Sequence, residues 1–202
     1  TDSSTNYALR LYFSNNNLTG PIPSESGALT SLTSLKLSYN KLTGYIPSEI
    51  AALTSLQRLD LYENDITGPI PSEIAALTSL TLLNLGNNDL TGPIPSEIGA
   101  LASLTILYLF SNDLPGPIPS EIAALLTILY LDNNFLSGPI PPEITSLTGL
   151  YLSNNDLTGP IPPEIGSLYL YNNVLTGSIP SEIGALTSLT KINLENNVLT
   201  GS

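Results

Sequence analysis

The chain has 202 residues, of which 17 are acidic and 5 basic, giving a formal net charge of -12; it contains neither cysteine nor histidine. Without cysteine there is no disulfide framework and no thiolate metal site, and without histidine the commonest general base is missing. The negative charge disfavours nucleic acid as a partner, because its phosphates are also negative. No apolar run approaches the roughly 20 residues of a membrane span, so we expect no direct membrane insertion of this segment.

One asparagine recurs along the chain and marks nine repeats. Its successive spacings are 24, 24, 24, 24, 22, 21, 18 and 24 residues. Apolar residues stand three and five positions before it, and an apolar residue, a glycine, an isoleucine and a proline follow it, as in segment 35–47. We call these residues the ladder asparagines: Asn16, Asn40, Asn64, Asn88, Asn112, Asn134, Asn155, Asn173 and Asn197.

This pattern resembles the plant-type leucine-rich repeat, LxxLxLxxNxLxGxIPxxIGxLxx, along nearly the whole chain. The family includes receptor-kinase ectodomains and polygalacturonase-inhibiting proteins. The resemblance implies an α/β solenoid: a right-handed superhelix with a parallel β-sheet on its concave side and 3-10 or irregular structure on its convex side. It also implies recognition on a repeat surface. We expect residues 1–202 to form a single domain of about nine rungs that is uncapped or a fragment, with possible self-association through the uncapped ends.

The alternation of apolar and polar residues before each ladder asparagine independently predicts stacking, since a unit this short cannot bury its apolar face alone. The ladder asparagine stands among core leucines, so its amide must find partners there. We predict that it bonds to backbone groups of adjacent repeats and has a structural role.

The most repeated segment, LTGPIPSEI at 90–98, is interpreted as scaffold. We predict that Pro95 starts a helical turn, that Ser96 caps it, and that Glu97 lies in its first turn. The equivalent glutamates form a column that we interpret as a solvated face, because no second carboxylate in the motif completes a metal site. We therefore expect no metal and no cofactor, and the glutamates are Glu25, Glu49, Glu73, Glu97, Glu121, Glu143, Glu164 and Glu182.

Aromatic residues gather at the outward strand positions of repeats five to eight. Tyrosine is amphipathic, has few rotors to freeze and is enriched at interaction hot spots. We predict that this patch binds a protein, peptide or glycan, with neighbour stacking on a solvated strand as the alternative interpretation. The candidate ligand-binding residues are Tyr108, Phe110, Tyr130, Tyr151, Tyr169 and Tyr171.

A column of threonines raises a second hypothesis, an ice-binding surface made of repeating hydroxyl and methyl groups. A structural or adhesive array is a third possibility. Two observations argue against ice binding. The outward neighbour of most of these threonines, two residues later, is a proline rather than a second threonine. The expected superhelix also twists rather than staying flat. The candidate ice-binding residues are Thr19, Thr43, Thr67, Thr91, Thr158 and Thr176.

The sequence favours a non-catalytic module at the cell surface or outside the cell. No nucleophile motif or cleft signature accompanies the few carboxylate pairs. A glycosylation sequon at Asn17-Leu18-Thr19 agrees with secretion in a eukaryote. The three shortened repeats lose residues from the segment before the strand, where we expect the coil to be pinched or residues to be missing.

Overall fold

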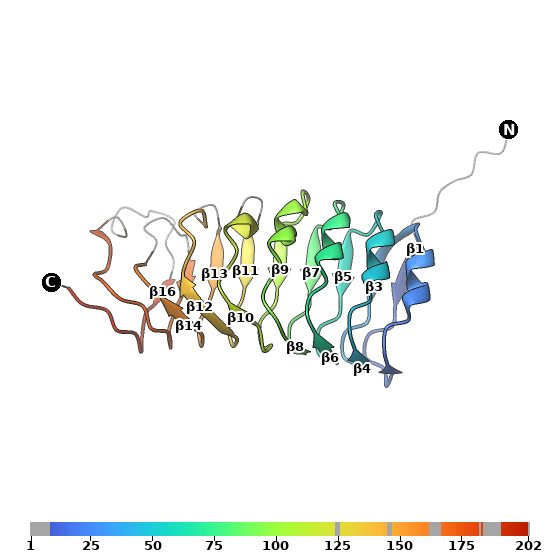
Figure 1. Cartoon of the computed structure of the whole chain (residues 1–202), viewed down its shortest axis with the longest axis horizontal. Helices are drawn as coiled ribbons and strands as arrows, with labels where there is room; N and C mark the ends of the chain where they lie inside the picture. Colours follow the sequence, from blue (N-terminus) through green and yellow to red (C-terminus); the bar gives the residue numbers. More distant parts are fainter. Residues whose placement is uncertain are drawn as a thin grey trace.

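The computed structural model describes residues 9–123, 126–144, 147–161, 167–181, 183 and 191–201. Within these ranges, one strand from each repeat joins a nine-stranded parallel sheet, in the order β1-β3-β5-β7-β9-β11-β13-β15-β16. Figure 1 shows these repeats stacked along one axis. The strands are β1 (Leu9–Tyr12), β3 (Leu32–Lys36), β5 (Arg58–Asp60), β7 (Leu82–Asn84), β9 (Ile106–Tyr108), β11 (Ile128–Tyr130), β13 (Gly149–Tyr151), β15 (Ser167–Tyr169) and β16 (Lys191–Asn193).

Short strands after the ladder asparagines form two smaller parallel sheets. One joins β2 (Thr19–Gly20), β4 (Lys41–Gly44), β6 (Asp65–Gly68) and β8 (Asp89–Leu90). The other joins β10 (Pro115–Gly116), β12 (Phe135–Pro139) and β14 (Asp156–Thr158).

The convex side carries 3-10 turns: η1 (Ser24–Ala28), η2 (Ser48–Ala52), η3 (Ser72–Ala76), η4 (Ser96–Ala100) and η5 (Ser120–Ala123). The predicted solenoid with a parallel sheet and 3-10 turns is therefore confirmed.

The predicted N-cap is wrong. Pro95, in an extended conformation with φ -69° and ψ 133°, occupies that position, and no side chain caps η4. The turn therefore starts at Ser96 itself, whose hydroxyl donates to the Glu97 carboxylate over 3.4 Å. The prediction that Glu97 lies in the first turn is confirmed.

The core is a continuous column of leucine and isoleucine that runs between the sheets and the 3-10 turns. Each repeat contributes the same positions; in the fourth repeat Leu83, Leu85 and Leu90 are fully or almost fully buried. Removing such apolar surface from water is the main stabilising term, and only stacking of successive repeats achieves it here.

The ladder asparagines connect successive repeats by hydrogen bonds. Asn112 Nδ2 donates to the carbonyls of Leu109 and Leu85, each over 3.1 Å, the second in the preceding repeat. Its Oδ1 accepts from the Leu90 amide over 3.0 Å. The amide of a buried side chain is thereby satisfied on both its donor and its acceptor side.

Two positions in each repeat adopt left-handed backbone conformations. The glycine after the ladder asparagine has a positive φ, for example 76° at Gly92. The residue immediately before the ladder asparagine does too, and there Asn is commonest, as at Asn133 (φ 57°) and Asn154 (φ 57°). Glycine has no Cβ penalty in this conformation, and Asn tolerates it better than most residues.

The sheet keeps its register through the shortened repeats. Tyr108 pairs with Tyr130, Tyr130 with Tyr151, and Tyr151 with Tyr169. The shortening at Leu125 and just before Ser167 falls at least partly outside the described residues, whereas Thr148 donates its backbone amide to Thr127 as the repeat pattern requires. The strands of the shortened repeats therefore keep the same register in the sheet as the strands of the full-length repeats.

Candidate ligand-binding face

Four tyrosines form a continuous row across β9, β11, β13 and β15, which we call the tyrosine row: Tyr108, Tyr130, Tyr151 and Tyr169. All four side chains are half-buried. Strand register sets the row, because each of these residues pairs with the next across the parallel sheet. Since neighbouring strands lie about 4.8 Å apart, side chains at one position of successive repeats meet.

The rings of the tyrosine row stack on one another. Tyr130 and Tyr151 have ring centroids 3.9 Å apart with planes 6° apart, and Tyr151 and Tyr169 are 4.6 Å apart at 12°. Tyr108 lies 4.9 Å from Tyr130 at a more tilted 35°. Tyr130 and Tyr151 therefore have a neighbouring ring on both sides, and the Lys191 ammonium lies over the Tyr169 ring, 5.1 Å from its centre. Within this part of the row, the ring edges and hydroxyls are what remains for solvent.

Phe110 extends the aromatic surface towards the first repeats. It contacts Tyr108 and Tyr130 edge-on at 6.2 Å and Tyr62 at 5.7 Å. Tyr62 in turn contacts Tyr39 at 5.1 Å. These last two residues were absent from the predicted patch, although the strand position of Tyr62 was the same as that of Phe110.

Tyr171, the sixth predicted residue, does not join this cluster. It is half-buried, and it makes no ring contact with any other residue that the structure describes. The neighbouring position in the preceding repeat is Ser153, which offers no ring to stack against.

Burial and neighbouring side chains raise the pKa of two phenols of this face. The pKa of Tyr62 is raised from 10.0 to about 12, mainly by burial and then by Glu63. The pKa of Tyr130 is also raised, again mainly by burial and then by a hydrogen bond with Tyr151. The phenols of Tyr62 and Tyr130 are therefore protonated and uncharged at neutral pH.

A second row of asparagines lies three residues after the tyrosines of β11, β13 and β15. Asn196 donates to Asn172, Asn172 to Asn154, and Asn154 to Asn133, over 2.6, 2.5 and 2.8 Å. Asn133 then donates to the Asp132 carboxylate over 2.9 Å. We call this the outer asparagine row; the amides of Asn154, Asn172 and Asn196 each donate to the preceding repeat, towards the N-terminus.

Asp132 lies at the end of the outer asparagine row and beside Tyr130. Burial raises its pKa above the usual 3.8, although a backbone hydrogen bond and Asn133 oppose the shift. Its Oδ1 atom is buried and has no hydrogen-bond partner within the described part of the chain. A buried, incompletely satisfied carboxylate destabilises the folded state unless it is protonated.

The threonine column does not form one flat array. Thr19 pairs with Lys41, and Thr43 pairs with Asp65, so each threonine is two positions out of register with the next one. The strands that carry the column also divide into two separate sheets between β8 and β10. Thr19, Thr43, Thr91, Thr158 and Thr176 are exposed, and Thr67 is half-buried.

The glutamate column is exposed wherever its side chains are described; Glu164 and Glu182 lie outside the described residues. No group of three carboxylates within the described ranges could hold a metal ion. No helix in the same ranges is long and apolar enough to cross a membrane. Asn17 and Thr19 of the sequon are both exposed.

Comparison with known proteins identifies the repeat family. Leucine-rich repeat models match residues 9–66 and five further segments, 79–101, 103–125, 125–147, 146–168 and 166–186. No curated protein sequence matches the chain. Modules of this family are typically non-catalytic.

Solved structures from plants are similar to the chain. The peptide hormone receptor RGFR1 in complex with RGF2 is 43% identical, with a TM-score of 0.87 over 92% of this chain and 31% of the receptor chain. The ectodomain of the Arabidopsis thaliana membrane receptor kinase GASSHO1/SCHENGEN3, in complex with CASPARIAN STRIP INTEGRITY FACTOR 2, is 38% identical, with a TM-score of 0.90 over 96% of this chain and 25% of that one.

A plant ice-binding protein is 36% identical, with a TM-score of 0.87 over 95% of this chain and 65% of that one. The chain thus spans less than a third of each receptor structure. The repeat matches cover most of the sequence, and the matching structures share its architecture; the chain belongs to the leucine-rich repeat family.

Proposed function

We propose that the chain is a non-catalytic recognition module that binds an extended peptide along its concave face, outside the cell or at its surface. The observation that carries this proposal is the stacked tyrosine row, above all Tyr130, Tyr151 and Tyr169. A stack of half-buried rings is rigid, so little side-chain entropy is lost when a ligand binds against it.

The ring geometry favours a peptide over a glycan. Sugars bind aromatic residues by lying on a ring face, and in this row the faces are covered by the neighbouring rings. Ring edges and phenol hydroxyls remain, and these suit a chain with alternating hydrogen-bond donors and acceptors. A peptide backbone running along the solenoid axis has that character.

The outer asparagine row supplies a matching set of amides. Each link between Asn154 and its neighbours uses one N–H and one oxygen lone pair. Every side-chain amide has two donors and two lone pairs, so one of each is left for a ligand. A peptide between the two rows would meet hydroxyls on one side and amides on the other.

The relatives support the choice of ligand and place. One is a plant peptide hormone receptor and another is a plant membrane receptor kinase ectodomain. The aromatic edges of the concave face and the absence of basic residues between 59 and 190 favour a ligand that is neutral or basic in its central part.

A display selection tests the proposal. The full chain is presented to a library of random linear peptides and, in parallel, to an array of neutral and acidic glycans. We expect linear peptides to be enriched and to bind with a dissociation constant of about 1–100 μM, as befits a modest interface. Enrichment of glycans with no peptide selected would overturn the proposal.

A second candidate is an ice-binding surface, favoured by the similarity to a plant ice-binding protein. The surface would be the exposed threonine column. Changing Thr91 and Thr158 to Lys should then abolish inhibition of ice recrystallisation, whereas an inactive wild-type chain would end this candidate. The staggered register argues against it, because an ice lattice requires a regular flat array.

A further inference from the structure

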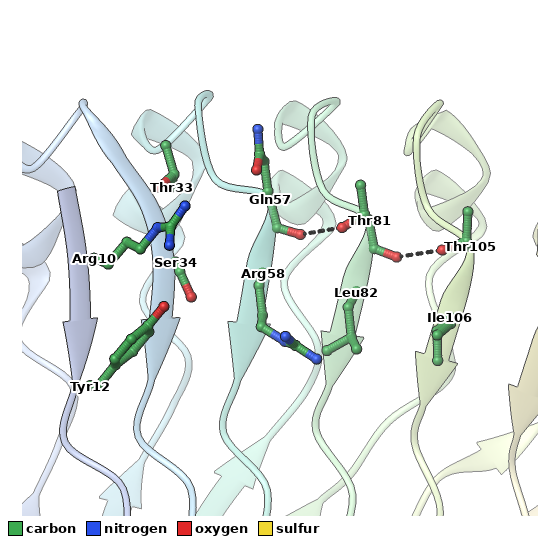
Figure 2. A pocket seen from close by; sticks show the side chains of 10 residues that line it. All are labelled: Arg10, Tyr12, Thr33, Ser34, Gln57, Arg58, Thr81, Leu82, Thr105 and Ile106. Atoms are coloured by element: carbon green, nitrogen blue, oxygen red, sulfur yellow. Dashed lines mark hydrogen bonds between the residues drawn. The ribbon is translucent and has the colours of Figure 1, made fainter. Parts of the chain in front are cut away.

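A depression in the first five repeats, which ends on β9 but includes no residue of the tyrosine row, is lined by charged, polar and aliphatic side chains. It has a volume of about 420 Å³, within the range of small-molecule sites. Its residues come from β1, β3, β5, β7 and β9 and from the positions just before these strands (Figure 2). They include Arg10, Ser34, Arg58, Leu82 and Ile106.

Two cations, Arg10 and Arg58, line one end of this depression in a protein of net charge -12. Strand register places Ser34 between Arg10 and Arg58, and Lys36 lies two residues along the middle strand. The Lys36 ammonium lies 5.0 Å from the centre of the Tyr12 ring. None of these cations forms an ion pair with a carboxylate in the described part of the chain.

Ser34 is the polar group at the centre of this cationic end. It is only 7% exposed, and its Oγ has no hydrogen-bond partner within the described residues. A buried hydroxyl without a partner costs free energy that a ligand acceptor can recover. Figure 2 shows Arg10 and Tyr12 extending towards Ser34 from β1, so that movement of these two exposed side chains would open the hydroxyl.

The threonines that line the depression offer few further donors. The hydroxyls of Thr81 and Thr105 already donate to the carbonyls of the preceding repeats, over 2.9 and 3.1 Å (Figure 2). Thr33 does the same towards Leu9 over 3.1 Å. The donors left for an anion are therefore those of Arg10, Ser34 and Arg58, together with the Tyr12 hydroxyl and the Gln57 amide.

The other end of the depression is aliphatic. Arg58 pairs with Leu82 across the sheet, and Leu82 pairs with Ile106. Both apolar side chains are half-buried and line the depression, so they form an aliphatic surface next to the arginines. Figure 2 shows Arg58 extending towards Leu82, which leaves its guanidinium at the boundary between the two ends.

We propose that this depression binds an aliphatic carboxylate, with the carboxylate between Arg10, Ser34 and Arg58 and the aliphatic group on Leu82 and Ile106. Guanidinium groups suit carboxylates because their donors form a planar fork. Arg10 and Arg58 are two strand spacings apart, about 10 Å. Arg10 already extends towards Ser34, whereas Arg58 extends towards Leu82 and has to change rotamer to reach a group placed over the strand between the two arginines. The site is independent of the peptide-binding proposal, because it shares no residue with the tyrosine row.

Calorimetric titration of the full chain with hexanoate tests the inference, with acetate, hexanamide and inorganic phosphate as comparison probes. Hexanoate should bind at least about tenfold more tightly than each of the others. Arg10→Gln, Arg58→Gln and Leu82→Ser should each weaken the binding of hexanoate by about tenfold or more. Lys191→Gln is the matched control, since Lys191 occupies the same row at the other end of the sheet and should leave binding unchanged.

Three results would overturn the inference: no hexanoate binding to the wild-type chain, equal binding to the arginine variants, or phosphate binding as tight as hexanoate. Circular dichroism melting verifies that each variant is folded. The carboxylate could belong to a free acid or to the C-terminal residue of a peptide. Comparing hexanoate with a short leucine-ended peptide and its C-terminal amide distinguishes these sources, since only the free-carboxylate peptide should compete if the second source is correct.

Discussion

The ring of Tyr130 lies 3.9 Å from the ring of Tyr151, with the two planes 6° apart, and the two residues come from adjacent repeats in the same strand position. Stacked phenols couple electronically and add about 0.5–1.5 kcal/mol beyond the burial of their surface. Tyr151 also stacks on Tyr169, so it is the central member of the most parallel part of the row.

Changing Tyr151 to Ala should therefore remove two stacking contacts at once. We expect near-ultraviolet circular dichroism to lose more intensity than one tyrosine accounts for, together with a loss of about 1–2 kcal/mol in the free energy of unfolding. Tyr45→Ala, which changes an exposed tyrosine outside the row, serves as the control. If both variants lost the same dichroism, the stack would be absent in solution.

Replacing Asn112 by Ala should destabilise the fold strongly. The change leaves the buried Leu90 amide without its side-chain acceptor and removes one of the two asparagine donors to each of the Leu85 and Leu109 carbonyls. We expect the free energy of unfolding to fall by about 2–4 kcal/mol, measured by urea denaturation. Asn16→Ala, at the exposed first position of the same ladder, should cost less than about 1 kcal/mol, and equal costs would contradict the role of burial.

The raised pKa of Tyr62 predicts a loss of stability in alkaline solution. Its phenol ionises near 10.0 when unfolded and at about 12 when folded. The unfolded chain thus loses its proton first, and the stability contributed by Tyr62 is complete below pH 10.0 and is lost as pH rises to about 12.

Tyr62→Phe should flatten this part of the profile of melting temperature against pH, whereas Tyr45→Phe should keep it. The phenylalanine variant also loses the hydrogen bond that Asn87 donates to the Tyr62 hydroxyl, which lowers its stability equally at all pH values. A profile identical in slope to wild type would refute the assignment.

Asp132 predicts a pH effect at the acid end. Because its pKa is raised in the folded state, the folded chain holds the proton more tightly, and this stabilisation is lost as pH rises through the raised pKa. The side chain of Asp132→Asn is neutral at every pH. The melting temperature of this variant should therefore rise relative to that of wild type between acidic and neutral pH. Asp156→Asn, at an exposed position, is the control; a constant difference across this range would disprove the buried-carboxylate account.

The repeat period made most of the fold predictable from the sequence. Nine asparagines at near-constant spacing required a stack, and the amide of a residue such as Asn64 had to bond to backbone because leucines surround it. The alignment of Tyr108, Tyr130, Tyr151 and Tyr169 at one strand position followed from the same count. Which rings stack and which meet edge-on did not follow, since ring geometry depends on side-chain rotation rather than on spacing.

Some features were misread or missed for physical reasons. Serine is a residue type that is common at N-caps, but here the extended Pro95 takes the N-cap position and the turn begins at Ser96. The outer asparagine row was overlooked because Asn133 and Asn154 stand next to the ladder asparagines; a preference for Asn at a left-handed position was the available signal. The carboxylate site combines residues from five repeats, and only strand register shows that Arg10 and Arg58 flank Ser34.

The most direct test of the central claim is the affinity of a selected peptide for wild type, Tyr151→Ala and Tyr45→Ala, measured by calorimetry. Peptide recognition on the tyrosine row predicts that Tyr151→Ala weakens binding by at least about tenfold while Tyr45→Ala leaves it unchanged. Equal affinity for all three proteins would contradict the account.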